Sequence, residues 1–374
     1  MRTLLFLLSL LLSVEALAQP LPQPPGIAAR AWLLQDYGSN QILASGNAGQ
    51  RIEPASLTKL MTAYLVFAAL KQGQLKPDQL LPVSERAWKA QGSRMFIEPS
   101  KPVTVAELLR GMIVESGNDA CIALAEAVAG SEAAFVKIMN HEAQRLGLKN
   151  THFANATGLP DPQHYSTATD LARLTSALIR DFPQYYPLYA LKDYSYNHIT
   201  QANRNRLLWL DPHVDGVKTG HSETAGYCLV ASAKRGTRRL ISVVLGADSD
   251  GDRADQSQQL LNFGFQYYDA VGLYGAGQVI SRLRVYKGAQ GRVSAGFIED
   301  FTLSVPKGQA SQIKVQLSSL QPLLAPVEKG SRVGTLMLTL GGRPYGEYPV
   351  VALETVPVAG LFGRAWDTMR LWFQ

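Results

Sequence analysis

Residues 54–73, which read PASLTKLMTAYLVFAALKQG, are the stretch from which the fold can be worked out. Pro54 suits the first turn of a helix, and apolar side chains recur at helical spacing from Leu57 to Ala68, ahead of Gly73. The pattern predicts a strongly apolar helix that buries the residues beside it.

Strands and further helices are predicted on either side of this helix. Strand patterns occur at 31–34, 41–43, 228–233 and 240–245, and helical patterns occur at 105–112, 120–129, 133–146 and 168–179. A strand pair followed by helices and then by more strands is typical of an α/β layer with a helical insertion.

The composition is that of an ordinary globular protein. Of its 374 residues, 46% are hydrophobic and 18% are charged, which excludes a disordered or collagen-like chain. The length indicates two domains. The net charge of +6 is not clustered, so it fits an anionic surface nearby and gives no support to nucleic-acid binding.

The N-terminus has the layout of a secretory signal peptide. Arg2 is followed by an apolar run from Leu4 to Val14 and by Ala16-Leu17-Ala18, whose small residues fit a cleavage site. We expect residues 1–18 to be removed on export, with an uncleaved anchor as the alternative.

Beyond residue 280 the helical period gives way to short alternating stretches. Gly341-Gly342 between two of them is typical of a hairpin turn. We predict a small antiparallel β domain at 281–357, following a catalytic domain at 19–280.

The final residues, 358–374, predict an amphipathic helix. Phe362, Trp366, Trp372 and Phe373 fall on one face, with charged residues toward the other. So short a helix cannot cross a bilayer, but it can lie in the membrane interface, and we expect it to be a membrane anchor. The alternative is a helix that docks on its own protein.

Cysteine usage is sparse. Cys121 and Cys228 both lie in apolar stretches, so they are expected to be buried free thiols, while one disulfide remains the alternative. The sequence has neither a Cys-x-x-Cys pair nor a Cys/His cluster at metal-ligand spacing, and we expect no metal and no cofactor.

Ser56 and Lys59 are the first candidate catalytic pair. The Ser-x-x-Lys pattern also occurs at Ser304 and Ser311, but those serines lie in alternating stretches, where residues three apart face opposite ways. Ser56 and Lys59 lie in the first turn of a helix, where residues i and i+3 share a face. A lysine whose pKa is lowered by burial or by a nearby cation, such as Lys218, can deprotonate a serine. The alternative is that Ser56 and Lys59 are simply a serine and a lysine on the surface of a helix.

Two further strings carry polar groups that suit a cleft. Ser116-Gly117-Asn118 follows an apolar run and precedes a helix, so it is either part of a site or a helix N-cap. Lys218-Thr219-Gly220 precedes an apolar strand, and it is either a carboxylate-binding segment or a turn at the sheet edge.

In this order, the three strings resemble the serine penicillin-binding protein and class A β-lactamase superfamily. The longer segments 54–59, 115–120, 203–205, 215–221 and 224–227 are similar to those of D-alanyl-D-alanine carboxypeptidases among the low-molecular-mass penicillin-binding proteins. The resemblance covers the mature chain and implies an antiparallel sheet with helices on both faces, followed by an all-β domain. The Glu-x-x-Leu-Asn loop of class A β-lactamases is absent.

The resemblance also implies roles for the catalytic residues. Ser56 would be the acylated nucleophile and Lys59 its general base. Ser116 and Lys218 would pass a proton to the leaving amine. The backbone amides of Ser56 and His221 would form the oxyanion hole.

The same resemblance implies the substrate contacts. Asn118 would hold the substrate amide and Thr219 its terminal carboxylate, with Gly220 allowing close approach. Arg253 would help to bind that carboxylate, and Arg204 is a weaker candidate at the rim of the cleft.

From these residues we expect a periplasmic serine D-Ala-D-Ala carboxypeptidase that acts on peptidoglycan stem peptides and is acylated by β-lactam antibiotics. Its expected partners are the stem peptide and, through the terminal helix, the surface of the inner membrane. The alternatives are an endopeptidase or transpeptidase of the same superfamily and a penicillin-binding scaffold without turnover.

Overall fold

A computed structural model describes residues 22–360 and Asp367. The predicted signal peptide at 1–18 and nearly all of the predicted terminal helix lie outside the described residues. The chain divides into two compact units, one of Pro24–Leu273 with Phe301–Lys307 and one built on Tyr274–Asp300 and the described residues from Gly308 onward. The bounds predicted from the sequence, 19–280 and 281–357, remain predictions.

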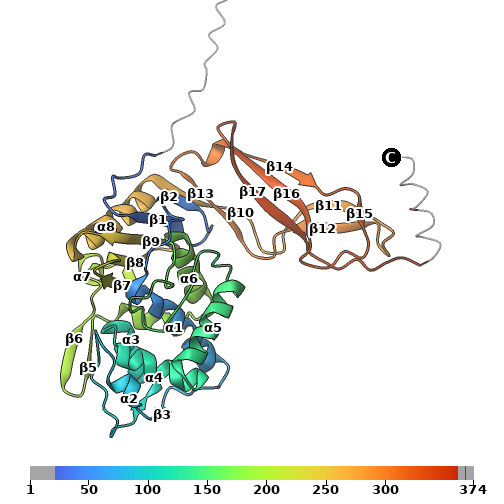
Figure 1. Ribbon diagram of the computed structural model, residues 1–374. Helices are drawn as coiled ribbons and strands as arrows, with labels where there is room; N and C mark the ends of the chain where they lie inside the picture. Colours follow the sequence, from blue (N-terminus) through green and yellow to red (C-terminus); the bar gives the residue numbers. More distant parts are fainter. Residues whose placement is uncertain (1–21, 361–366, 368–374) are drawn as a thin grey trace, which may run out of the picture. The chain divides into compact units, whose positions relative to one another are not determined.

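The first unit is organised around a five-stranded antiparallel sheet (Figure 1). Its order is β2-β1-β9-β8-β7, so the first two strands of the chain pair with strands that follow the helical region. The strands are β1 (Ala31–Asp36), β2 (Ile42–Gly46), β7 (Val214–Ser222), β8 (Gly226–Arg235) and β9 (Arg238–Ala247). The strands predicted at 31–34, 41–43, 228–233 and 240–245 are confirmed.

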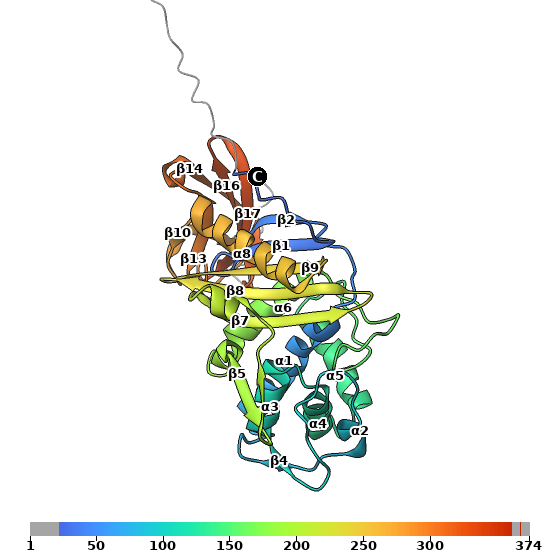
Figure 2. The same ribbon diagram turned by 90° about the vertical axis from the view of Figure 1, so that its left-hand side faces the viewer.

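Helices cover both faces of this sheet, as Figure 2 shows for α8 on one face and α1 and α6 on the other. The helices predicted at 54–73, 105–112, 120–129, 133–146 and 168–179 are confirmed, whereas α8 was not predicted. The helices are α1 (Lys59–Lys71), α2 (Glu85–Trp88), α3 (Val105–Val114), α4 (Asn118–Ala129), α5 (Glu132–Arg145), α6 (Ala168–Asp181), α7 (Leu207–Leu210) and α8 (Asp250–Tyr267).

Strand alternation explains why the sheet has two apolar faces. Leu33 packs into the larger core with α1, and the next residue, Leu34, packs into a separate core with α8. In β9, Val243 likewise packs into the larger core and Val244 into the core with α8. Within α1, every residue from Lys59 to Leu70 except Ala68 is buried, as the all-round apolar sequence predicts.

Short elements complete the first unit. The 3₁₀ turns η1 (Ala55–Thr58) and η2 (Tyr186–Ala190) accompany three two-stranded sheets: β3 (Leu80–Leu81) with β4 (Val103–Thr104), β5 (Asp193–Tyr196) with β6 (Ile199–Ala202), and β10 (Tyr268–Tyr274) with β13 (Phe301–Pro306). Cys121 and Cys228 are free and buried, as favoured from the sequence.

The second unit contains a six-stranded sheet of order β14-β16-β17-β12-β11-β15. Gly341 and Gly342 both have positive φ and join β16 to β17, so the predicted hairpin is confirmed. The strands are β11 (Val279–Tyr286), β12 (Arg292–Gly296), β14 (Ile313–Ser319), β15 (Leu323–Leu324), β16 (Arg332–Leu340) and β17 (Arg343–Ala352), with the turn η3 (Ala310–Gln312). Ser311 lies in η3, not in the strand predicted for it.

In the described part of the chain, each helix is too short or too polar to pass through a bilayer.

Candidate active site

Ser56 lies in the turn η1, directly before α1. The sequence predicted that it would lie in the first turn of the helix itself, but α1 begins only at Lys59. Ala55 has a φ of 47°, in the left-handed region, and this sharp entry turns the chain into η1. Residues i and i+3 of a 3₁₀ turn are eclipsed, so Ser56 and Lys59 lie on the same side.

Lys59 is buried and touches Ser56. Its side chain Nζ lies 3.0 Å from Ser56 Oγ, 2.7 Å from Asn118 Oδ1 and 2.6 Å from the Thr157 carbonyl oxygen. Only 1% of Lys59 is exposed, so the alternative of a surface pair is wrong. Burial lowers the pKa of Lys59 from 10.5 to about 8, and the Arg204 guanidinium adds a smaller lowering.

The contacts of Lys59 fix the direction of its lone pair. A neutral amine has two N–H groups, and Asn118 and Thr157 offer an acceptor for each. Asn118 donates its own amide N–H to the Gln91 carbonyl at 2.6 Å, which orients its oxygen toward Lys59. The lone pair of the amine is therefore left for the hydroxyl proton of Ser56.

Ser116 and Lys218 form a second buried pair. Ser116 lies between α3 and α4 with a φ of 62°, and its Oγ accepts a hydrogen bond from Lys218 Nζ at 3.0 Å. Gly117, from the same string, is the N-cap residue of α4, but no side chain caps that helix, so the Ser116 hydroxyl does not act as a cap. Burial lowers the pKa of Lys218 well below its usual value, and the nearby Lys59 lowers it further.

Lys218, Thr219, Gly220 and His221 all lie within β7, so the alternative of a turn is wrong. This strand passes very close to the turn that holds Ser56. A Cβ atom at Gly220 would lie 2.9 Å from the Pro54 carbonyl oxygen and 3.2 Å from the Ser56 nitrogen. Only glycine allows that approach, and it brings the backbone of β7 beside the Ser56 N–H.

Arg253 projects from α8 toward the strand β7. Its Nη1 donates to the carbonyl oxygens of Gly220 at 3.1 Å and Cys228 at 3.4 Å, and its Nη2 pairs with Asp250. Burial lowers the pKa of Arg253, but the guanidinium stays charged. The side chain is thus held rigidly at the edge of the site.

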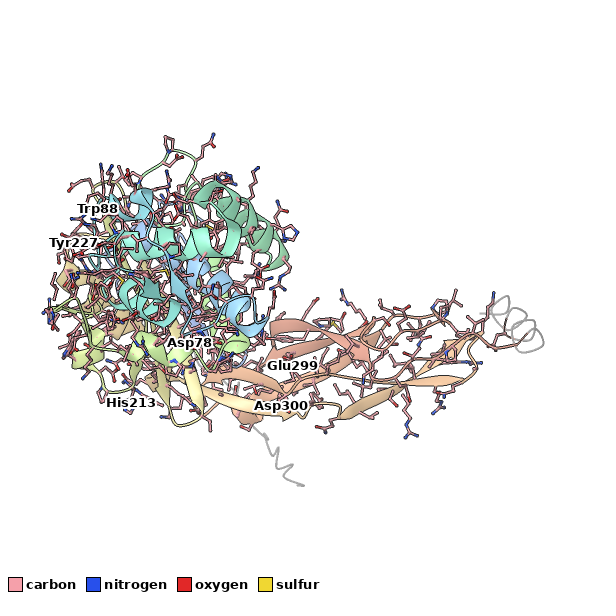
Figure 3. The ribbon with its side chains drawn as sticks, turned by 90° about the horizontal axis from the view of Figure 1, so that it is seen from below. Asp78, Trp88, His213, Tyr227, Glu299 and Asp300 are labelled. Carbon is pink, nitrogen blue, oxygen red and sulfur yellow. The ribbon has the colours of Figure 1, made fainter. Side chains whose placement is uncertain are left out.

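These residues surround one cleft of about 640 Å³. Tyr227 of β8, labelled in Figure 3, lines it and lies against His221 with ring centroids 4.1 Å apart. Lys59, Asn118 and Lys218 are buried behind the lining. The lining residues are Ser56, Ser93, Ser116, Ala202, Asn203, Arg204, Arg206, Thr219, Gly220, His221, Tyr227, Asp250 and Arg253.

The structure adds residues that the sequence did not identify. The Thr157 carbonyl holds Lys59, and Gly158 leaves no room for a Cβ against the Ala55 carbonyl. The Asp119 carboxylate accepts backbone N–H groups of residues 95–97 at 2.8 to 3.2 Å, which fixes the loop that presents Ser93. In the sequence, only Gly158 could have indicated the contact between the Thr157 carbonyl and Lys59.

The sequence matches two known families. The family described as D-alanyl-D-alanine carboxypeptidase, peptidase S11, matches residues 18–249, and the C-terminal domain of penicillin-binding protein 5 matches residues 268–358. The D-alanyl-D-alanine carboxypeptidase DacC of Escherichia coli K12 is 43% identical over 95% of this chain and 91% of its own length.

Solved structures are similar as well. Penicillin-binding protein 5 from Haemophilus influenzae is 42% identical, with a TM-score of 0.84 over 90% of this chain and 99% of that chain. Penicillin-binding protein D2 from Listeria monocytogenes, in its ampicillin-bound form, is 31% identical, with a TM-score of 0.60 over 65% of this chain and 100% of that chain.

Proposed function

The chain belongs to the peptidase S11 family of serine D-alanyl-D-alanine carboxypeptidases, and on this premise we propose that it removes the terminal D-alanine of peptidoglycan stem pentapeptides through an acyl-enzyme on Ser56. The observation that carries the proposal is the contact of 3.0 Å between Ser56 Oγ and a buried lysine whose pKa is about 8. At pH 7.5 roughly a quarter of such a lysine is neutral and able to accept a proton.

Acylation begins when Ser56 Oγ attacks the carbonyl carbon of the penultimate D-alanine. Lys59 takes the hydroxyl proton as the ester bond forms. The oxygen of the tetrahedral intermediate is placed at the backbone N–H of Ser56, beside the N–H of His221 on β7. The close approach of Gly220 to the Ser56 nitrogen supports this arrangement.

The amide C–N bond then breaks and D-alanine leaves. Its nitrogen takes the proton that Lys59 removed from Ser56, passed along Ser116 Oγ and Lys218 Nζ, which are in contact at 3.0 Å. Asn118 holds the substrate amide, and Thr219 and Arg253 hold the terminal carboxylate. Water then attacks the ester: its hydroxyl group joins the acyl carbon, the shortened peptide leaves, and its remaining proton restores the hydroxyl of Ser56.

A β-lactam follows the same first step, because its amide and carboxylate occupy the same positions. Purified protein is expected to form a covalent adduct with a fluorescent penicillin and to release D-alanine from a stem pentapeptide. Ser56→Ala should lose both activities. Ser311→Ala, which alters the Ser-x-x-Lys string at Ser311 and Lys314, is the matched control and should lose neither. Labelling that survives in Ser56→Ala contradicts the proposal.

The location of the enzyme is part of the proposal. Export by residues 1–18 and attachment by the amphipathic helix at 358–374 would place the enzyme in the periplasm at the inner membrane, where the stem peptides lie. A chain ending at Pro357 is expected to stay active but to lose binding to vesicles containing anionic phospholipid. Equal vesicle binding by the full and shortened chains contradicts the attachment.

A further inference from the structure

Gln201, at the end of the β5–β6 hairpin, joins two walls of the cleft. Its Nε2 donates one hydrogen bond to the Arg94 carbonyl at 2.8 Å and one to Glu115 Oε2 at 2.8 Å. Arg94 follows Ser93 in one wall, and Glu115 directly precedes Ser116 in the other. One amide group therefore uses both of its N–H donors to tie these segments together.

The hairpin itself continues into the cleft. The residues directly after Gln201, which are Ala202, Asn203 and Arg204, all line it. A shift of the Gln201 side chain would thus release three parts of the lining together: the Ser93 loop, the Ser116 segment and the strand leading to Arg204.

Glu115 is an unusual partner for such a bond. Only 1% of it is exposed, and its Oε1 has no hydrogen-bond partner among the described residues. Burial, followed by the Asp119 carboxylate, raises the pKa of Glu115 from 4.5 to about 8, so the neutral acid predominates at neutral pH. A neutral carboxyl still accepts from Gln201 without leaving a charge in the interior.

We propose that Gln201 and Glu115 form a buried clamp that positions Ser116 relative to the Ser93 loop during acylation of Ser56. Neither residue touches the reacting atoms, so both are positioning residues. The inference rests on the proposed acyl-enzyme, because its effect is read through the rate of acylation. Ionising Glu115 opens the clamp, since an anion with an unpaired oxygen draws water into the segment before Ser116.

Other ionisable groups lie near Glu115, and Asp119 acts directly on its pKa. Asp119 faces it from α4 and Tyr194 from β5, while Glu107 and Arg110 of α3 lie beside Tyr194. On the side of β7, Lys218 contacts the adjacent Ser116. Replacing Glu115 by glutamine removes one titration and leaves all of these groups in place.

The test measures the rate of acylation by a fluorescent penicillin from pH 5 to 10, together with the melting temperature of each variant. Gln201→Met, which keeps the side-chain volume but removes both donors, should slow acylation about tenfold at pH 7, as a displacement of about half an ångström would. Asn197→Gly is the matched control, because Asn197 also joins the hairpin to the loop, through Glu98 at 3.4 Å, but has no bond to Glu115, and glycine tolerates its φ of 49°. It should leave the rate within about twofold.

Glu115→Gln gives the second readout and does not depend on the folding of Gln201→Met. Its rate should match that of the wild type at pH 7 and exceed it at least threefold at pH 9.5, because only the wild type loses the clamp on ionisation. A Gln201→Met rate equal to that of Asn197→Gly, or coincident pH profiles for Glu115→Gln and wild type, overturns the proposal. A wild type that does not react at all would instead refute the acyl-enzyme.

Discussion

Replacing Gly220 with alanine would place a methyl group between β7 and the turn that carries Ser56. The new Cβ would lie 2.9 Å from the Pro54 carbonyl oxygen, whereas ordinary contacts begin at 3.4 Å. Both neighbours are backbone, so the strand and the turn must separate by about half an ångström. Because a displacement of about 1 Å costs roughly a hundredfold in rate, half that distance is expected to cost about tenfold.

The assay is the second-order rate of acylation by a fluorescent penicillin, followed on purified Gly220→Ala. Overpacking of this kind also costs about 1–3 kcal/mol, so the melting temperature should fall by several degrees. Gly251→Ala on α8 is the matched control, because its Cβ would meet nothing closer than 3.6 Å. This variant should lower neither the acylation rate nor the melting temperature. A Gly220→Ala protein that reacts at the wild-type rate with an unchanged melting temperature refutes the close approach as the reason for this glycine.

Three further results are expected. Because only neutral Lys59 accepts a proton and its pKa is about 8, its ionisation should make acylation rise about tenfold per pH unit below pH 7, reach half its maximum near pH 8 and gain no more than about twofold above that; a rate that is flat from pH 5.5 to 8 contradicts this. Arg253→Gln should raise KM about tenfold or more for a pentapeptide with a free carboxylate, and it should not do so for the carboxyl-terminal amide; an equal loss for both peptides contradicts carboxylate binding. Asp119→Asn should lower the free energy of unfolding by about 1–3 kcal/mol in denaturant titration, since a charged acceptor of backbone N–H groups becomes a neutral one; an unchanged midpoint contradicts its role in the loop.

Most of the fold was predictable where hydrophobic period and burial agree. The helix α1 and the strands β8 and β9 have nearly continuous apolar sequences, and all were predicted. The helix α8 was missed because its buried face includes polar residues such as Gln256 and Ser257, which blur the helical period. The strand β7 was not predicted, since two glycines and a buried lysine interrupt its apolar pattern.

The site was predictable in its side chains but not in its backbone contacts. Ser56, Lys59, Ser116 and Lys218 were selected by type and spacing, and the structure brings them together in two pairs. The Thr157 carbonyl could not be identified by residue type, apart from the neighbouring Gly158, because a backbone acceptor is present at every residue. Contacts of this kind depend on how distant segments pack, and spacing along the chain does not encode that.

The proposed chemistry needs a lysine that can become neutral and accept a proton, and it needs an arginine that stays charged and attracts an anion. The structure provides both. Burial moves both lysines toward neutrality, which lets Lys59 accept a proton but makes the pair poor at attracting an anion. Arginine remains charged under the same burial, so Arg253 and Arg204 supply the positive potential at the wall of the cleft. Arg204 also lowers the pKa of Lys59, and both arginines lower that of Lys218, so in the proposed mechanism the cations at the wall of the cleft help to keep the buried lysines neutral.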